Sequence, residues 1–146
     1  MITYSAVIDS PMAPVAAFAY LADLTNFEDW DPGTKEAVQV GGQGPGLGSE
    51  YDLKVGMVSL HYTVQEFDEP KLVVAHGTHP LVDSTDSMTV EPTPSGSRIT
   101  YEAELSTAGP LRLLDPVFNR AFQRMGDDAA DGLARALDGR RTDDGV

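Results

Sequence analysis

The 146-residue sequence contains no cysteine. This absence excludes disulfide bonds, thiolate catalysis and thiolate metal sites, and it is typical of cytoplasmic proteins. Long apolar runs are absent as well, because no segment approaches the roughly 18 apolar residues of a membrane-spanning helix. The first residues also lack the basic flank and continuous apolar stretch of a signal peptide. We therefore expect a soluble, unprocessed, cytoplasmic protein.

Basic residues are scarce, since 10 Lys and Arg oppose 23 Asp and Glu and give a formal net charge of -13. Such a charge repels nucleic-acid backbones and anionic lipid surfaces. We therefore expect no nucleic-acid partner and no stable membrane insertion. The chain length suits one domain with its own core, which we assign to residues 1–139, followed by a flexible tail at 140–146 with little to bury. A monomer and a homodimer both remain open.

The N-terminal segment predicts a strand followed by two short helices. Residues 2–8 alternate as expected of a strand that has one buried face. Residues 14–22 begin with proline and place apolar side chains at helical spacing, which predicts the first helix. Thr25 and Glu28 have the spacing of a capping box, so we expect a second short helix there, ending before Pro32.

The middle of the chain has the pattern of strands and turns that is typical of an antiparallel sheet. Between Lys35 and Leu105, clusters of glycine and proline separate runs of five to ten residues, which predicts six strands. The alternation is clearest in residues 99–105, where apolar side chains occupy one face and polar ones the other. A sheet with one apolar face needs a covering layer.

The last long segment, residues 115–137, predicts the helix that covers this sheet. Asp115 is a candidate N-cap, and Gly139 a candidate stop. Gly126 and Gly132 each cost about 1 kcal/mol relative to alanine in a helix, so we expect close packing or local flexibility there. The predicted inner stripe consists of Phe118, Ala121, Phe122, Met125, Ala129, Leu133 and Ala136.

This order of elements, with motifs at its turns, caps and core positions, matches a known family. The matching motifs are Ala13-Pro14, Phe18–Asp23, Asn26-Phe27, Trp30–Pro32, Gly46–Gly48, Val90–Pro92, Thr100–Leu105 and Gly109–Pro116. Through them the chain resembles the START-like, birch-pollen-allergen-like superfamily, in its bacterial polyketide cyclase/dehydrase and lipid-transport (SRPBCC) branch.

The resemblance implies an α+β helix-grip fold. A curved antiparallel sheet of about seven strands would wrap around the long C-terminal helix, with two short helices after the first strand. It also implies an elongated apolar cavity between sheet and helix, which holds lipids, sterols, polyketides or other aromatic compounds. It implies no common catalytic residue, because the matching motifs are structural.

Two other patterns do not predict a cofactor or metal site. The glycine-rich 41–48 segment has neither dinucleotide-binding nor P-loop spacing, and we interpret it as a connection. His76 and His79, followed by Asp83 and Asp86, have the composition of a zinc site. On a strand, however, residues three apart point to opposite faces, so we predict no metal and no cofactor.

Asp86 is the first candidate for acid/base chemistry. It alternates in register with Met88 and Val90, which should place it on the apolar face of its strand. A buried carboxylate without a cation has a raised pKa, which suits general acid/base work on an enolisable substrate. The alternatives are a structural, hydrogen-bonded acid or a register shift that turns the side chain outward. His76 is the second candidate.

The inner faces of the predicted sheet and helix provide the candidate ligand-binding residues. These are Trp30, Tyr51, Leu53, Tyr62, Met88, Tyr101, Phe118, Phe122 and Met125. Phe27, with Trp30, could gate the cavity or pack the second helix against the sheet.

Three functions remain open at this point. The first is binding of a hydrophobic or aromatic small molecule, lipid-like or polyketide-like, in the cavity. The second is a polyketide cyclase, aromatase or dehydratase that uses the same cavity with Asp86 or His76 as acid/base. The third is a protein-interaction module without a ligand, which would have a completely filled core.

Overall fold

The computed structural model describes residues 1–142. The strands are β1 (Ile2–Ser10), β2 (Thr34–Gly41), β3 (Glu50–Val55), β4 (Val58–Asp68), β5 (Leu72–His79), β6 (Val82–Thr93), β7 (Gly96–Thr107) and β8 (Arg140–Arg141). The helices are α1 (Pro14–Ala22), α2 (Phe27–Trp30) and α3 (Asp115–Ala136), with two 3-10 helices, η1 (Leu24–Asn26) and η2 (Gly109–Leu114).

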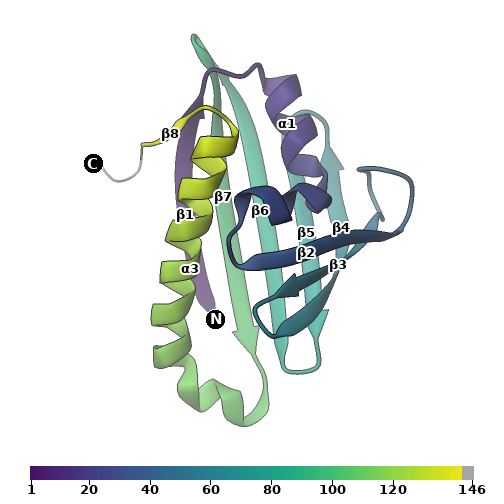
Figure 1. Ribbon diagram of the computed structural model, residues 1–146, viewed down its shortest axis with the longest axis vertical. Coiled ribbons are helices and arrows are strands. Elements are labelled where there is room, and N and C mark those ends of the chain that lie inside the picture. The colour runs from purple at the N-terminus through teal and green to yellow at the C-terminus, as the bar shows by residue number, and fades with distance from the viewer. Residues whose placement is uncertain (143–146) are drawn as a thin grey trace.

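The strands form one sheet in the order β2-β3-β4-β5-β6-β7-β1-β8, with antiparallel neighbours throughout. The sheet curves strongly, so that β2 and β3 cross in front of the middle strands (Figure 1). Helix α3 runs along the concave side next to β1, while α1 and α2 cover the opposite part of that side. This is the predicted helix-grip arrangement, and the six strands expected in the middle of the chain are β2 to β7.

The eighth strand comes from the segment that we expected to begin a flexible tail. Arg140 and Arg141 pair with Asp9 and Ile8 of β1. The guanidinium of Arg141 also lies 3.2 Å from an oxygen of Asp127 on α3. These contacts connect residues 140–141 to β1 and α3. Residues 143–146 of the predicted tail lie outside the described part of the chain.

The predicted capping box at the second short helix is wrong. Asp23, not Thr25, caps the turn, because its Oδ1 accepts hydrogen bonds from the Thr25 amide at 3.1 Å and hydroxyl at 2.6 Å. Glu28 instead accepts a hydrogen bond from the amide of Ala37 at 2.8 Å. The physical reason is that β2 passes within reach of Glu28, so this carboxylate connects α2 to the edge of the sheet.

Helix α3 matches the predicted helix within one residue at its end. Asp115 lies inside the first turn rather than at the N-cap, and its carboxylate accepts a hydrogen bond from the Thr107 hydroxyl at 2.7 Å. Ala136, predicted on the inner stripe, is exposed, because Leu137 at the end of the helix takes the buried position. No helix within residues 1–142 combines the length and apolar character needed to cross a membrane.

Gly126 occupies a position where α3 touches β1. A β-carbon there would lie 2.5 Å from the ring of Tyr4, closer than real side chains approach. The Tyr4 hydroxyl in turn donates a hydrogen bond to Asp127 at 2.8 Å. The glycine therefore serves close packing, which is one of the two explanations expected from the sequence.

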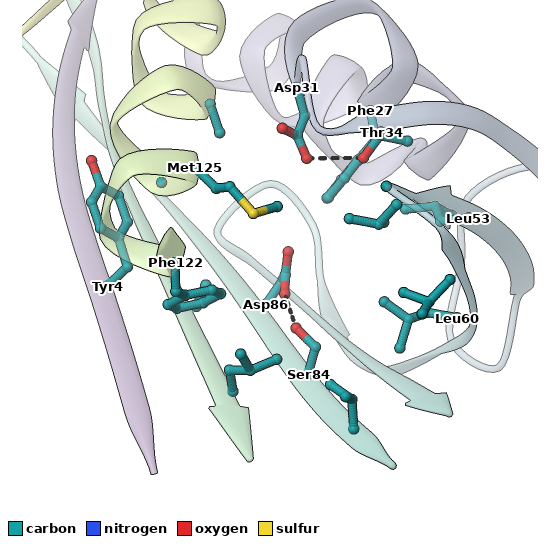
Figure 2. A pocket seen from close by; sticks show the side chains of 18 of the residues that line it. Tyr4, Phe27, Asp31, Thr34, Leu53, Leu60, Ser84, Asp86, Phe122 and Met125 are labelled. Atoms are coloured by element: carbon teal, nitrogen blue, oxygen red, sulfur yellow. Dashed lines mark hydrogen bonds between the residues drawn. The ribbon is translucent and has the colours of Figure 1, made fainter. Parts of the chain in front are cut away.

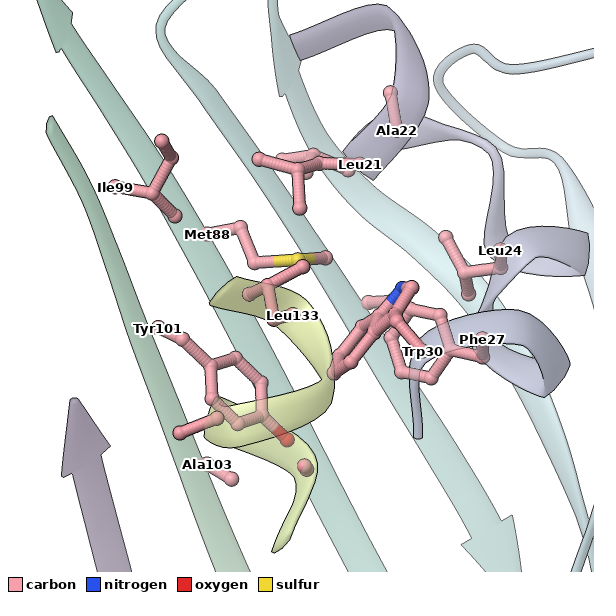
Figure 3. Packing of buried hydrophobic residues seen from close by; sticks show 14 of the residues in the cluster. Leu21, Ala22, Leu24, Phe27, Trp30, Met88, Ile99, Tyr101, Ala103 and Leu133 are labelled. Carbon is pink, nitrogen blue, oxygen red and sulfur yellow. The ribbon is translucent and has the colours of Figure 1, made fainter. Parts of the chain in front are cut away.

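The core is densely packed at one end of the domain, beneath α1 and α2. Figure 3 shows Trp30 and Phe27 in one cluster with Leu24, Met88 and Leu21. The rings of Phe27 and Trp30 lie 4.5 Å apart between centroids. These helices therefore fill the concave side of the sheet at this end.

Candidate ligand-binding site

A cavity of about 300 Å³ lies at the other end of the domain, between the concave face of the sheet and the first half of α3. Its volume is at the lower limit of typical small-molecule sites, which occupy roughly 300–1,000 Å³. The apolar lining residues are Phe27, Leu53, Val55, Gly56, Val58, Leu60, Val82, Ala103, Leu105, Phe118, Ala121, Phe122, Met125, Gly126 and Ala129. The polar lining residues are Tyr4, Asp31, Thr34, Tyr62, Ser84, Asp86 and Tyr101.

Asp86 of β6 points into this cavity from the floor formed by the sheet (Figure 2). It is 4% exposed, so the inward orientation predicted from its register is confirmed and the register-shift alternative is excluded. Its Oδ1 accepts a hydrogen bond from the Ser84 hydroxyl at 3.2 Å, and its Oδ2 accepts one from the Tyr101 hydroxyl at 3.3 Å. Both are long compared with the usual ~2.7–2.8 Å between oxygen atoms.

The environment of Asp86 favours its protonated form. Burial raises the pKa of this carboxyl from 3.8 to about 7, and the negative charge of Asp31 adds to the rise. The hydrogen bonds from Ser84 and Tyr101 act in the opposite direction but are weaker. A carboxyl that exchanges its proton near neutral pH suits general acid/base chemistry.

Asp31 is a second carboxyl in the same cavity, and the sequence analysis missed it. It follows α2 and projects from the wall opposite Asp86 (Figure 2). The amide of Gly33 donates to its Oδ1 at 3.0 Å, and the Thr34 hydroxyl donates to its Oδ2 at 2.9 Å. Burial raises the pKa of Asp31, with a smaller contribution from the charge of Asp128. The only sequence signal was the short-range turn pattern of an aspartate followed by glycine and threonine.

Two buried tyrosines stand beside Asp86. Tyr62 of β4 and Tyr101 of β7 line the cavity, and burial raises the pKa of each phenol well above 10. The ring of Tyr62 lies over Gly77 of β5, where an added β-carbon would come within 2.6 Å of the ring. Tyr101 also packs edge-on against Trp30, with ring centroids 5.7 Å apart. These hydroxyls remain protonated at neutral pH and can donate hydrogen bonds.

Six of the nine predicted ligand-binding residues line the cavity: Leu53, Tyr62, Tyr101, Phe118, Phe122 and Met125. Trp30, Tyr51 and Met88 do not; they are fully buried in the packed core. The physical reason is that α1 and α2 fill this part of the concave face. Strand alternation identifies which side chains face inward, but it cannot distinguish a filled end from an empty one.

Met125 marks the edge of the cavity on α3. It is 41% exposed although it lines the cavity, and Ala121, one turn earlier, is exposed as well. Figure 2 shows the thioether of Met125 projecting between Asp31 and Asp86. A flexible thioether at this position can adapt to different ligands. The open cavity also contradicts the completely filled core expected of a module without ligand.

His76, the second acid/base candidate, lies on the other face of the sheet. Ala75 pairs with Asp86 in the β5–β6 register, so the following residue, His76, points outward. Its Nε2 lies 3.7 Å from a carboxylate oxygen of Asp83, and it does not line the cavity. His76 therefore cannot act on a molecule in the cavity. Within residues 1–142, no group of three or more His, Asp or Glu side chains is placed to hold a metal ion.

The fold is shared with solved structures of low sequence identity. A START superfamily protein from Mycobacterium smegmatis superposes with a TM-score of 0.76 at 12% identity, covering 93% of this chain and 97% of that one. A hypothetical protein from Helicobacter pylori gives a TM-score of 0.75 at 13% identity, covering 93% and 86% of the two chains.

A third structure is the di-domain ARO/CYC StfQ from the steffimycin biosynthetic pathway. It gives a TM-score of 0.70 at 15% identity, covering 93% of this chain and 50% of that one. Comparison with curated proteins gave no match. A family model described as "Polyketide cyclase / dehydrase and lipid transport" matches residues 1–138, nearly the whole domain. The chain therefore belongs to the polyketide cyclase/dehydrase and lipid-transport family and has its START-like, helix-grip fold.

Proposed function

We propose that this protein binds a small hydrophobic or aromatic molecule in the cavity between the sheet and α3. The observation that carries the proposal is the cavity itself, about 300 Å³ of space lined mainly by aliphatic and aromatic side chains. Unfilled apolar space lowers stability, because the side chains around it lose packing partners. A ligand that fills the space would restore those contacts. Family membership supports the same class of ligand.

A second candidate function is a cyclase, aromatase or dehydratase reaction in the same cavity. It is favoured by Asp86, whose carboxyl faces the cavity with a pKa raised to about 7 by burial. Such a group can remove a proton from an enolisable ketone and return it to the oxygen that leaves as water. The cavity would contribute by holding a flexible chain in the folded conformation that closes the ring.

The binding proposal is tested with the neutral fluorescent probe N-phenyl-1-naphthylamine. We expect its emission to rise on addition of the wild-type protein, and Met125→Trp to weaken binding by at least about tenfold because the indole occupies the cavity. Val117→Trp is the matched control, because Val117 lies on the same helix, is 66% exposed and does not line the cavity. Equal binding by both variants, with native circular dichroism, would place the probe elsewhere and reject the proposal.

The enzymatic alternative requires a separate readout. Asp86→Asn keeps the shape of the side chain but removes its ability to exchange a proton. If a cyclisation or dehydration activity is found, this variant should abolish turnover while probe binding stays within about twofold of wild type. An active Asp86→Asn variant would remove this residue from the mechanism.

A further inference from the structure

The charges of the cavity are all of one sign. Asp31 and Asp86 both line it, and none of the described residues around it is Lys, Arg or His. The two carboxyls come from different elements, the turn after α2 and the middle of β6, and they face the same space across Met125 (Figure 2).

We propose that the cavity selects small aromatic amines, whose ammonium group lies between Asp31 and Asp86 while the ring occupies the apolar remainder. This inference rests on the proposed function of small-molecule binding and specifies the class of ligand.

Asp86 has unused capacity to accept hydrogen bonds. A carboxylate has about four acceptor positions, and the two long bonds from Ser84 and Tyr101, at 3.2 and 3.3 Å, leave the others facing the cavity. An ammonium group offers three donors and forms charge-assisted bonds of about 2.7–2.9 Å to carboxylates. It would therefore bind Asp86 more strongly than its present partners do.

The carboxylate of Asp31 is already ordered for binding the same ammonium group. The amide of Gly33 and the hydroxyl of Thr34 fix both of its oxygens, so binding requires little ordering of this side chain. The charge of Asp31 also disfavours ionisation of Asp86, because it raises the pKa of that carboxyl. A cation between them would remove this repulsion and stabilise both ionised forms.

The remaining lining suits the aromatic part of such a ligand. Four aromatic side chains line the space: Phe118 and Phe122 from α3, and Tyr62 and Tyr101 from the sheet. Aromatic faces also attract cations, which adds to the preference for an ammonium group. A carboxylate ligand, such as a fatty acid, would instead place a third negative charge beside Asp31 and Asp86, with no basic group to bind it.

The test compares three ligands that share a naphthalene ring system and differ in charge: the cationic 1-naphthylmethylamine, the neutral 1-naphthylmethanol and the anionic 1-naphthaleneacetate. Isothermal titration calorimetry with the full chain should show the amine binding at least about tenfold more tightly than the alcohol, with the acetate weakest. Asp86→Asn and Asp31→Asn should each reduce amine affinity about tenfold and change alcohol affinity less than about twofold. Glu102→Gln, which neutralises an exposed acid outside the cavity, should change none of the three affinities.

The outcomes separate this inference from the proposed function. If the alcohol binds as well as the amine and Met125→Trp blocks both, the binding function stands and the amine preference is rejected. Tightest binding of the acetate, or an unchanged amine preference in both asparagine variants, would also overturn the inference. If the neutral probe and all three naphthyl ligands fail to bind, the proposed function itself fails.

Discussion

Gly132 of α3 packs directly against the backbone carbonyl of Trp30 at the end of α2, so that a β-carbon at position 132 would overlap the carbonyl oxygen. This contact holds the second half of α3 against the short helices. It closes the packed end of the domain, whereas the first half of α3 lines the cavity. One missing side chain thus helps to determine where the domain is filled and where it is open.

We predict that Gly132→Ala destabilises the protein. Helix propensity alone favours alanine by about 1 kcal/mol. The overlap with the Trp30 carbonyl should outweigh this gain and lower the free energy of unfolding by about 1–3 kcal/mol, because backbone must shift to make room. Urea denaturation measures the difference. Arg135→Ala, an exposed change on the same helix, should stay within about 0.5 kcal/mol of wild type. A stabilised Gly132→Ala variant would refute the close contact.

We predict that Asp86 makes stability fall as pH rises. Its pKa is 3.8 in an unfolded chain and about 7 when folded, so the folded state holds the proton more tightly. Between these values the unfolded state binds fewer protons, and this group alone lowers the free energy of unfolding by up to about 4 kcal/mol as pH increases.

Asp86→Asn provides the test, because its amide stays neutral. The stability of the variant relative to wild type should increase by about 2–3 kcal/mol between pH 5 and pH 8, because the wild-type carboxyl loses its stabilising proton over this range. Urea denaturation at the two pH values measures this, and the other titrating groups cancel in the comparison. A constant difference between the proteins at both pH values would contradict the raised pKa.

We predict that His61 titrates above its ordinary pKa of 6.5. On the outer face of the sheet, its Nδ1 lies 2.8 Å from an oxygen of Asp52 and its Nε2 lies 2.8 Å from one of Glu50. Hydrogen bonds to Asp52 and then to Glu50 raise the pKa of the imidazole. An NMR titration should show this rise, and Asp52→Asn should reverse part of it, because the contact with Glu50 remains. A wild-type value at or below 6.5 would contradict the arrangement.

The same pair of contacts should have a small effect on stability. Because the pKa of His61 is raised on folding, its contribution is present in full below pH 6.5 and is lost as pH rises through the folded value. The imidazole is 43% exposed, so His61→Gln should cost less than about 1 kcal/mol at pH 5.5 and almost nothing at pH 9. Thermal denaturation at the two pH values measures this.

We predict no measurable affinity for duplex DNA at physiological salt. The net charge of -13 repels the phosphate backbone, and the arginines of α3 are interspersed with Asp127, Asp128 and Asp131. Fluorescence anisotropy with a labelled duplex should stay flat to micromolar protein. Sub-micromolar, salt-sensitive binding would contradict this prediction, because it would require a local basic surface whose attraction for DNA exceeds the repulsion by the net negative charge.

The sequence by itself determined the element order and the faces of the elements. Apolar residues recur every 2 residues in a strand and about every 3.6 residues in a helix, and both periods are local properties of the sequence. They correctly predicted α1, α3 and the inward orientation of Asp86. Local spacing was less reliable where a side chain had two possible partners. Glu28 had the spacing of a capping residue. Its carboxylate instead accepts a hydrogen bond from the amide of Ala37 in β2, which lies outside the turn.

Tertiary structure alone decided which inward-facing residues surround open space. Tyr51 and Met88 have the same inward pattern as Tyr62 and Tyr101, but they are buried in the filled core, as is Trp30 of α2. Asp31 joined the site for the same reason, because the turn after α2 ends at the cavity wall, opposite Asp86. Alternation specifies a direction along one strand or helix, whereas a cavity depends on the distances between elements far apart in sequence, which only the folded chain sets.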